Sequence, residues 1–108
     1  MELSIIAREI YEATHRLAAA GNEVYRLAKE KADTERDYRL ALSKEILILK
    51  SEGMSVTLVS DVARGNVADL KHKRDLAEGK YKASIEALKS IQAQVNALQS
   101  ILKFQSEV

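Results

Sequence analysis

Large apolar residues follow a three-four spacing from the start of the chain to about position 49, which is the pattern of an amphipathic helix. The spacing fades at Lys31 and Thr34, resumes in the same phase at Tyr38 and then drifts slightly, as expected when a 3.6-residue helix carries a 3.5-residue repeat. We therefore predict one long helix over residues 2–52. Its weakest point is Gly21-Asn22, where a kink or a break giving three helices is the alternative. The apolar series is Leu3, Ile6, Ile10, Ala13, Leu17, Ala20, Val24, Leu27, Tyr38, Ala41, Leu42, Ile46 and Leu49.

The segment 53–65 separates this helix from a second periodic series. Gly53 can take the left-handed conformation that ends a helix, and a short helical turn is expected to start near Thr57 or Ser60 and to end at Gly65. Asn66 is expected to cap a second long helix over residues 66–105. The second series is Val67, Leu70, Arg74, Ala77, Tyr81, Ser84, Leu88, Ile91, Val95, Leu98 and Leu102.

Two long helices joined by a 13-residue connector are expected to fold back as an antiparallel hairpin. The predicted fold is therefore an all-α, coiled-coil-like hairpin that forms a single helical domain over residues 1–108. In the expected register, Lys31 and Thr34 lie opposite Ser84, and Arg74 at a seam position pairs with an acid such as Glu45.

A two-helix hairpin buries only one stripe, so a second apolar stripe indicates a further neighbour for each helix. Residues Ser90–Leu102 also carry no charge, which is unusual for a solvated helix. We expect a homodimer that forms a four-helix bundle, with a tetramer as the alternative. The second stripe consists of Ile5, Tyr11, Leu42, Ile46, Leu49, Ile85, Ile101 and Phe104.

The composition supports long helices and offers little for catalysis. The chain has no proline and four glycines, and its 17 basic residues nearly balance 16 acidic ones. It has no cysteine, no apolar run of the about 18 residues that cross a membrane, and no basic, apolar start typical of a signal peptide. Cytoplasmic location is the expectation, with no membrane partner.

The residue types needed for catalysis or metal binding are not grouped in the sequence. His15 and His72 fall at solvent-side positions of different helices, and no Glu-x-x-His motif of di-iron bundles is present. No serine or threonine lies in a pattern that would activate it as a nucleophile. We therefore expect neither an enzyme nor a bound metal or cofactor.

Two groups of residues are candidates for binding. A basic group is expected either to contact nucleic-acid phosphates or to form a solvated face laced with ion pairs. It comprises Arg64, Lys71, Lys73, Arg74, Lys80 and Lys82. An apolar group in the connector is expected either to cap the end of the bundle or to hold a partner protein. It comprises Val56, Leu58, Val59 and Val62.

The connector and the second helix also carry a resemblance. Its residues are Ser51-Glu52-Gly53, Thr57, Asp61–Gly65, Val67–Leu70, Arg74–Glu78, Tyr81–Ala83, Glu86–Lys89 and Ala97–Ser100. With these residues the stretch Ala41–Leu102 resembles a family of small phage and prophage proteins of Gram-positive hosts. Such proteins are generally encoded near recombination and single-strand-binding genes, and the family has no catalytic residues. The resemblance implies a non-enzymatic phage accessory protein acting in the host cytoplasm, and the alternative is a nucleic-acid-binding factor in phage recombination or replication.

Overall fold

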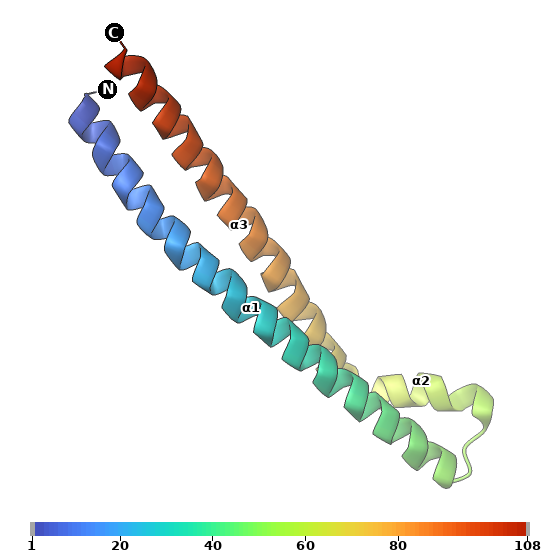
Figure 1. The fold of residues 1–108 in the computed structure, drawn as a ribbon. Helices are drawn as coiled ribbons and strands as arrows, with labels where there is room; N and C mark the ends of the chain where they lie inside the picture. The colour runs from blue at the N-terminus through green and yellow to red at the C-terminus, as the bar shows by residue number, and fades with distance from the viewer. Residues whose placement is uncertain (1, 108) are drawn as a thin grey trace. The chain divides into compact units, whose positions relative to one another are not determined.

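The computed structural model describes residues 2–107, which form three helices and the turns between them. Helix α1 spans Leu3–Ser51, α2 spans Val56–Asn66 and α3 spans Ala68–Ser106. α1 and α3 run antiparallel, as Figure 1 shows. The prediction of an all-α helical hairpin is confirmed.

α1 is continuous through Gly21-Asn22, so this pair does not break the helix. Its 49 residues contain no proline, and a methyl group built on Gly21 would meet no atom within 4 Å. One glycine costs about 1 kcal/mol in a helix. The buried residues on either side of it, Ala13 and Leu27, supply more than enough packing to offset that cost.

α1 ends at Ser51, and Gly53 takes the left-handed conformation beyond its end, as the sequence predicts. Gly53 has a φ of +84°, its N–H donates to the Lys50 carbonyl at 3.1 Å, and the Met54 N–H donates to the Leu49 carbonyl at 3.1 Å. These are the two hydrogen bonds of the Schellman motif, in which apolar contact between the flanking residues completes the cap. Met54 packs against the cluster that contains Leu49 and so provides that contact.

The segment expected as a connector is mostly helix, and this is a correction to the prediction. α2 has 11 residues, starts at Val56 rather than Thr57 or Ser60, and includes Asn66. Only Val67 separates α2 from α3, and its N–H still donates to the Ala63 carbonyl at 3.2 Å. Asn66 therefore does not cap α3, and its side-chain amide instead donates to a Glu45 carboxylate oxygen at 2.8 Å.

The described residues group into two compact units, and both long helices contribute to both of them. The terminal unit consists of Met1–Arg26 with Lys82–Val108, and the central unit consists of Leu27–Tyr81. Among the described residues of the terminal unit only Ile6, Ala13 and Val95 are buried, and the Arg16 guanidinium donates to the Gln94 side-chain carbonyl oxygen at 3.1 Å between the helices.

The central unit has a larger core because α2 covers the last turns of α1. Leu49, Val59 and Ala63 form a buried cluster, and partly buried side chains surround it: Leu42, Ile46, Met54 and Val62. Three members of the predicted second stripe (Leu42, Ile46 and Leu49) are therefore covered within the chain. The members of the second apolar stripe that could support an oligomer therefore lie in the terminal unit.

The seam positions are buried or half-buried except Leu3, which is 47% exposed, but the predicted partner of Arg74 is wrong. Arg74 lies against Glu35 and Tyr38 rather than Glu45, while Lys31 lies over the ring of Tyr81, within one turn of the expected position opposite Ser84. The prediction assumed that α3 starts level with the end of α1. Because α2 takes that place, α3 starts beside an earlier part of α1, and the partner of Arg74 changes.

Candidate functional site

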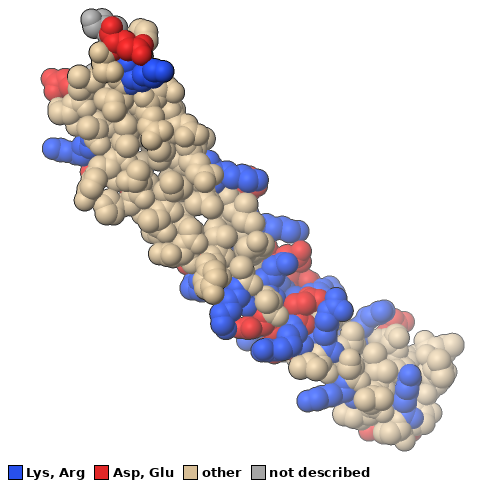
Figure 2. All heavy atoms as spheres, viewed as in Figure 1, with Lys and Arg blue, Asp and Glu red and all other residues tan. Residues whose placement is uncertain are grey.

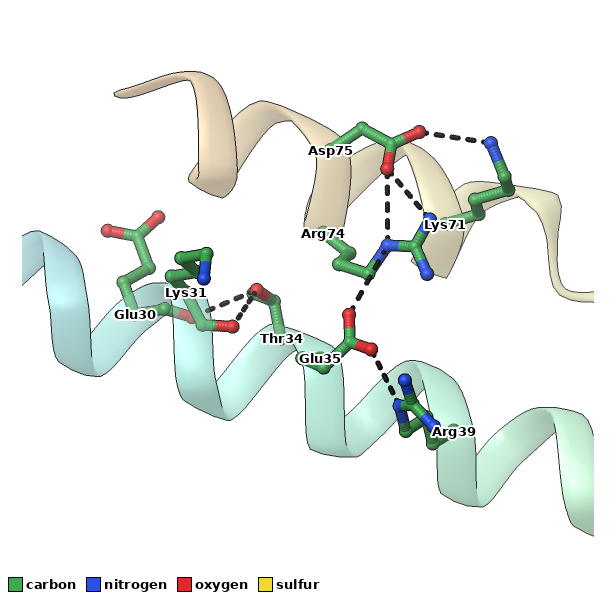
Figure 3. Close-up of polar contacts among 8 residues, drawn as sticks. All are labelled: Glu30, Lys31, Thr34, Glu35, Arg39, Lys71, Arg74 and Asp75. Carbon is green, nitrogen blue, oxygen red and sulfur yellow. Dashed lines mark hydrogen bonds and ion pairs between the residues drawn. The ribbon is translucent and has the colours of Figure 1, made fainter. Parts of the chain in front are cut away.

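The most polar part of the central unit lies where α1 and α3 meet, around Arg74 (Figure 3). The Arg74 guanidinium is 3.4 Å from a Glu35 carboxylate oxygen and also donates to Asp75 at 3.0 and 3.1 Å. Its carbon lies 4.5 Å from the centre of the buried Tyr38 ring, a cation–π contact. Arg74 is thus placed at a seam position with its charge fully engaged.

The acids around Arg74 are themselves shared with other cations. The Lys71 ammonium donates to Asp75 at 3.1 Å, and the Arg39 guanidinium donates to Glu35 at 2.6 Å. The hydrogen bonds from Lys71 and then from Arg74 lower the pKa of Asp75 below its ordinary value. The hydrogen bond to Asp75 raises the pKa of Arg74 in turn. The contact between Asp75 and Arg74 therefore favours the charged form of both groups.

Thr34 is the one buried polar side chain in the described part of the chain, and it is satisfied locally. Its hydroxyl contacts the carbonyls of Glu30 at 2.9 Å and Lys31 at 3.0 Å, so a polar residue fits at a seam position. Lys31 adds a cation–π contact with Tyr81, with its nitrogen 5.6 Å from the ring centre. Within residues 2–107 no buried side-chain nitrogen or oxygen lacks a partner.

A groove of about 950 Å³ lies beside this network, within the central unit. Its walls combine small apolar side chains with cations and acids that pair with one another. Among the described residues no group of three or more acids or histidines could hold a metal ion. The lining residues are Ala28, Lys31, Ala32, Glu35, Arg36, Arg39, Leu40, Arg74, Glu78 and Tyr81.

The basic residues expected to contact nucleic acid do not form a free basic stripe. Arg64 on α2 lies 3.9 Å from Asp61, and Lys80 lies 3.9 Å from Glu30. Lys71 and Arg74 are held by Asp75, as described above. Lys73 is exposed on α3, while Lys82 is exposed but belongs to the terminal unit and has interactions of its own.

The apolar residues of the former connector divide into two pairs. Val59 is 2% exposed and Val62 is partly buried, so both pack in the core of the central unit. Val56 is 82% exposed and Leu58 is 55% exposed, on a helix whose other face is packed against α1. Val59 and Val62 therefore help to close the core, while a contact of Val56 and Leu58 with a partner protein stays a prediction.

Glu35 and Glu45 are the contacts that the sequence did not identify correctly. The seam pattern placed Arg74 at the interface but gave no position for α3 along α1. Glu35 precedes Arg39 by four residues, which signals an ion pair on one helix face. A sequence prediction that included the full length of α2 would have shown that α3 starts further from the end of α1. It would then have placed Glu35, rather than Glu45, beside Arg74.

The chain matches no protein-family model, and comparisons with curated proteins and with solved structures find no match either. None of the helices in residues 2–107 is long and apolar enough to cross a membrane. His15 and His72 are exposed on α1 and α3, respectively. The function therefore has to be inferred from the residues themselves.

Proposed function

We propose that this chain is a non-enzymatic interaction protein, a helical hairpin that binds other protein chains through apolar surfaces it cannot cover itself. The observation that carries the proposal is the contrast between a small core and large exposed apolar side chains. Ile6 is the one large side chain that is fully buried among the described residues. Exposed large apolar residues include Leu3, Tyr11, Leu47, Val56, Leu58 and Phe104.

The polar groups support the same proposal. Glu35 in the wall of the groove is paired with both Arg74 and Arg39, so this part of the groove offers paired charges rather than an activated nucleophile or base. Such networks hold a packing register more than they bind a ligand. We therefore assign the Arg74 network to the fold and the exposed apolar residues to function.

The proposed assembly is a homo-oligomer of hairpins that presents α2 to a partner protein. The resemblance to small phage and prophage proteins supports an accessory role in phage-infected or lysogenic hosts, in the cytoplasm. On α2, Val56 and Leu58 point away from the buried cluster and form the proposed contact with that partner.

The partner contact is tested by photo-crosslinking from residue 58. A photoreactive amino acid replaces Leu58 in one sample and the exposed Asp61 of the same helix in the control, in protein expressed in a Gram-positive host. A defined adduct from position 58 that disappears when Val56 is changed to Ser is expected. Equal adducts from both positions, or none from position 58, contradict the contact.

Nucleic-acid binding is the second candidate, and its support is weaker because four of the six basic residues lie beside acids. It is tested with labelled single- and double-stranded DNA at two salt concentrations, comparing the natural chain with Lys73→Glu. Arg74 should stay unchanged, since its contacts hold α1 against α3. Steeply salt-dependent micromolar binding that Lys73→Glu weakens would make this the leading function.

A further inference from the structure

One face of the terminal unit carries no charge along α1. The side chains there repeat with a three-four spacing, parallel to the seam that packs against α3. They are Ser4, Ala7, Tyr11, Thr14, Ala18, Gly21 and Tyr25, which we call the α1 face. Tyr11 and Tyr25 are 65% and 79% exposed. Figure 2 shows a broad uncharged surface over this half of α1 and the adjoining half of α3.

The charged residues of this part of α1 lie on its other sides. Arg16 bonds to Gln94 across the opposite edge of the seam, and Glu23 pairs with Arg26 along the helix. On α3 the positions beside the seam on the uncharged side, Ile85, Gln92 and Gln99, also carry no charge. A solvated helix normally carries charge on every exposed side. The α1 face is therefore built like a helix–helix interface whose partner is another helix.

We propose that a second copy of this chain covers the α1 face, forming a two-fold symmetric dimer. This inference deepens the proposed function, on which it rests, by naming the surface through which the hairpins assemble.

The exposed area of the chain leaves room for such a partner. The chain exposes 7681 Å². A compact monomer of 12.0 kDa exposes about 6,000 Å². The excess is about 1,700 Å², more than the roughly 800 Å² that each partner gives to a stable interface. Ser4 to Tyr25 spans about 32 Å of helix, so two helices side by side offer a face of about 630 Å² per copy, at the lower end of the about 600–1,000 Å² that each partner gives to a stable interface.

The pattern of large and small residues fits a second copy in the antiparallel direction. With Thr14 at the two-fold axis, the bulky Tyr11 meets the small Ala18 of the second copy, and Tyr25 meets the small Ser4. A parallel pair would put Tyr11 against Tyr11 and Ala18 against Ala18, which leaves gaps beside an overpacked contact. The uncharged face also places no like charges opposite each other, which would oppose pairing of identical surfaces. A two-fold contact of this kind closes on itself.

The test compares two neighbouring exposed alanines of α1 by sedimentation equilibrium. Ala18→Glu puts a charge in the α1 face, whereas Ala19→Glu puts the same charge one residue away, outside it. The natural chain and Ala19→Glu are expected at twice the 12.0 kDa chain mass. For Ala18→Glu the dissociation constant should rise at least about a hundredfold. Circular dichroism checks that both variants remain helical.

The direction of pairing is tested by disulfide formation, since the natural chain has no cysteine. Thr14→Cys is expected to oxidise readily to a covalent dimer, whereas Ala7→Cys and Ala19→Cys are not, because only residue 14 meets its own copy. Rapid crosslinking at residue 7 as well indicates a parallel pair and overturns the symmetry. A dimer that both glutamate variants leave intact overturns the α1 face alone. A monomeric natural chain overturns both this inference and the self-association in the proposed function.

Discussion

Arg74 of α3 lies 3.4 Å from Glu35 of α1, so a side chain at a seam position carries an ion pair where the pattern alone would place an apolar residue. The same guanidinium lies over the ring of Tyr38, which is 7% exposed. A charge in a helix seam lowers stability but fixes which residues face each other. The pair therefore accounts for the register of the central unit.

Replacing Arg74 should lower the free energy of unfolding. Arg74→Ala removes the cation–π contact, the ion pair with Glu35 and the packing of the side-chain stem, for an expected loss of about 1–2 kcal/mol. Lys73→Ala, one residue away and exposed, should change stability by less than about 0.5 kcal/mol. Urea unfolding followed by circular dichroism, at one fixed protein concentration, measures both. Equal effects of the two variants would contradict the claim that Arg74 fixes which residues of α1 and α3 face each other.

The two valines of α2 should differ sharply when shortened. Val59→Ala opens space beside Leu49 and Ala63 and should cost about 2 kcal/mol of unfolding free energy. Val56→Ala should be neutral or slightly stabilising, since Val56 is 82% exposed and alanine is the better helix former. Thermal unfolding of the pair, at matched concentration, tests whether α2 packs on α1. If Val59→Ala has no effect, the packing of α2 described above is wrong.

Two glycines should respond in opposite directions to alanine. A methyl group at Gly79 in α3 meets no atom within 4 Å, so Gly79→Ala should raise the unfolding free energy by about 0.5–1 kcal/mol. Gly53 has a φ of +84°, which alanine adopts only with strain. Gly53→Ala should therefore lower the unfolding free energy by about 1 kcal/mol. Denaturation midpoints of the two variants check the cap and the continuity of α3.

Asp75 should make stability depend on pH in the acid range. Hydrogen bonds from Lys71 and Arg74 lower its pKa in the folded chain below the ordinary value of 3.8. The unfolded chain then binds more protons, so the contribution of Asp75 is present above pH 3.8 and is lost as the pH falls through the folded-state pKa. Asp75→Asn should flatten part of the fall in unfolding free energy between about pH 5 and about pH 2. An unchanged pH profile would show that Asp75 is not held by these cations.

The helix periodicity of the sequence predicted which positions are buried. It did not predict which residues of α1 and α3 face each other, because that pairing depends on α2. Buried positions such as Ile6, Ala77 and Val95 follow directly from the three-four spacing. The pairing across the seam depends on where α3 starts, and a short valine-rich helix such as α2 has no long periodic pattern to reveal it. For the same reason the sequence could not tell which valines of α2 close the core and which remain exposed.

For the candidate binding residues too, the sequence identified the residues but not all of their contacts. The basic residues could be listed from the sequence, but the acid partners Glu30 and Glu35 on α1 become apparent only when the helices are placed. The α1 face is visible once the seam is known, because it is the parallel series on one side of that seam. Its lack of charge, rather than its hydrophobicity, is the signal.

The most direct test of the account is the mass of the natural chain in solution. Sedimentation equilibrium over about 1–100 µM covers the affinity of ordinary specific complexes. The expected result is a species of twice the 12.0 kDa chain mass through most of this range, with dissociation at the lowest concentrations. A single species of 12.0 kDa at every concentration would contradict the claim that these hairpins complete their small core with another copy of the same chain.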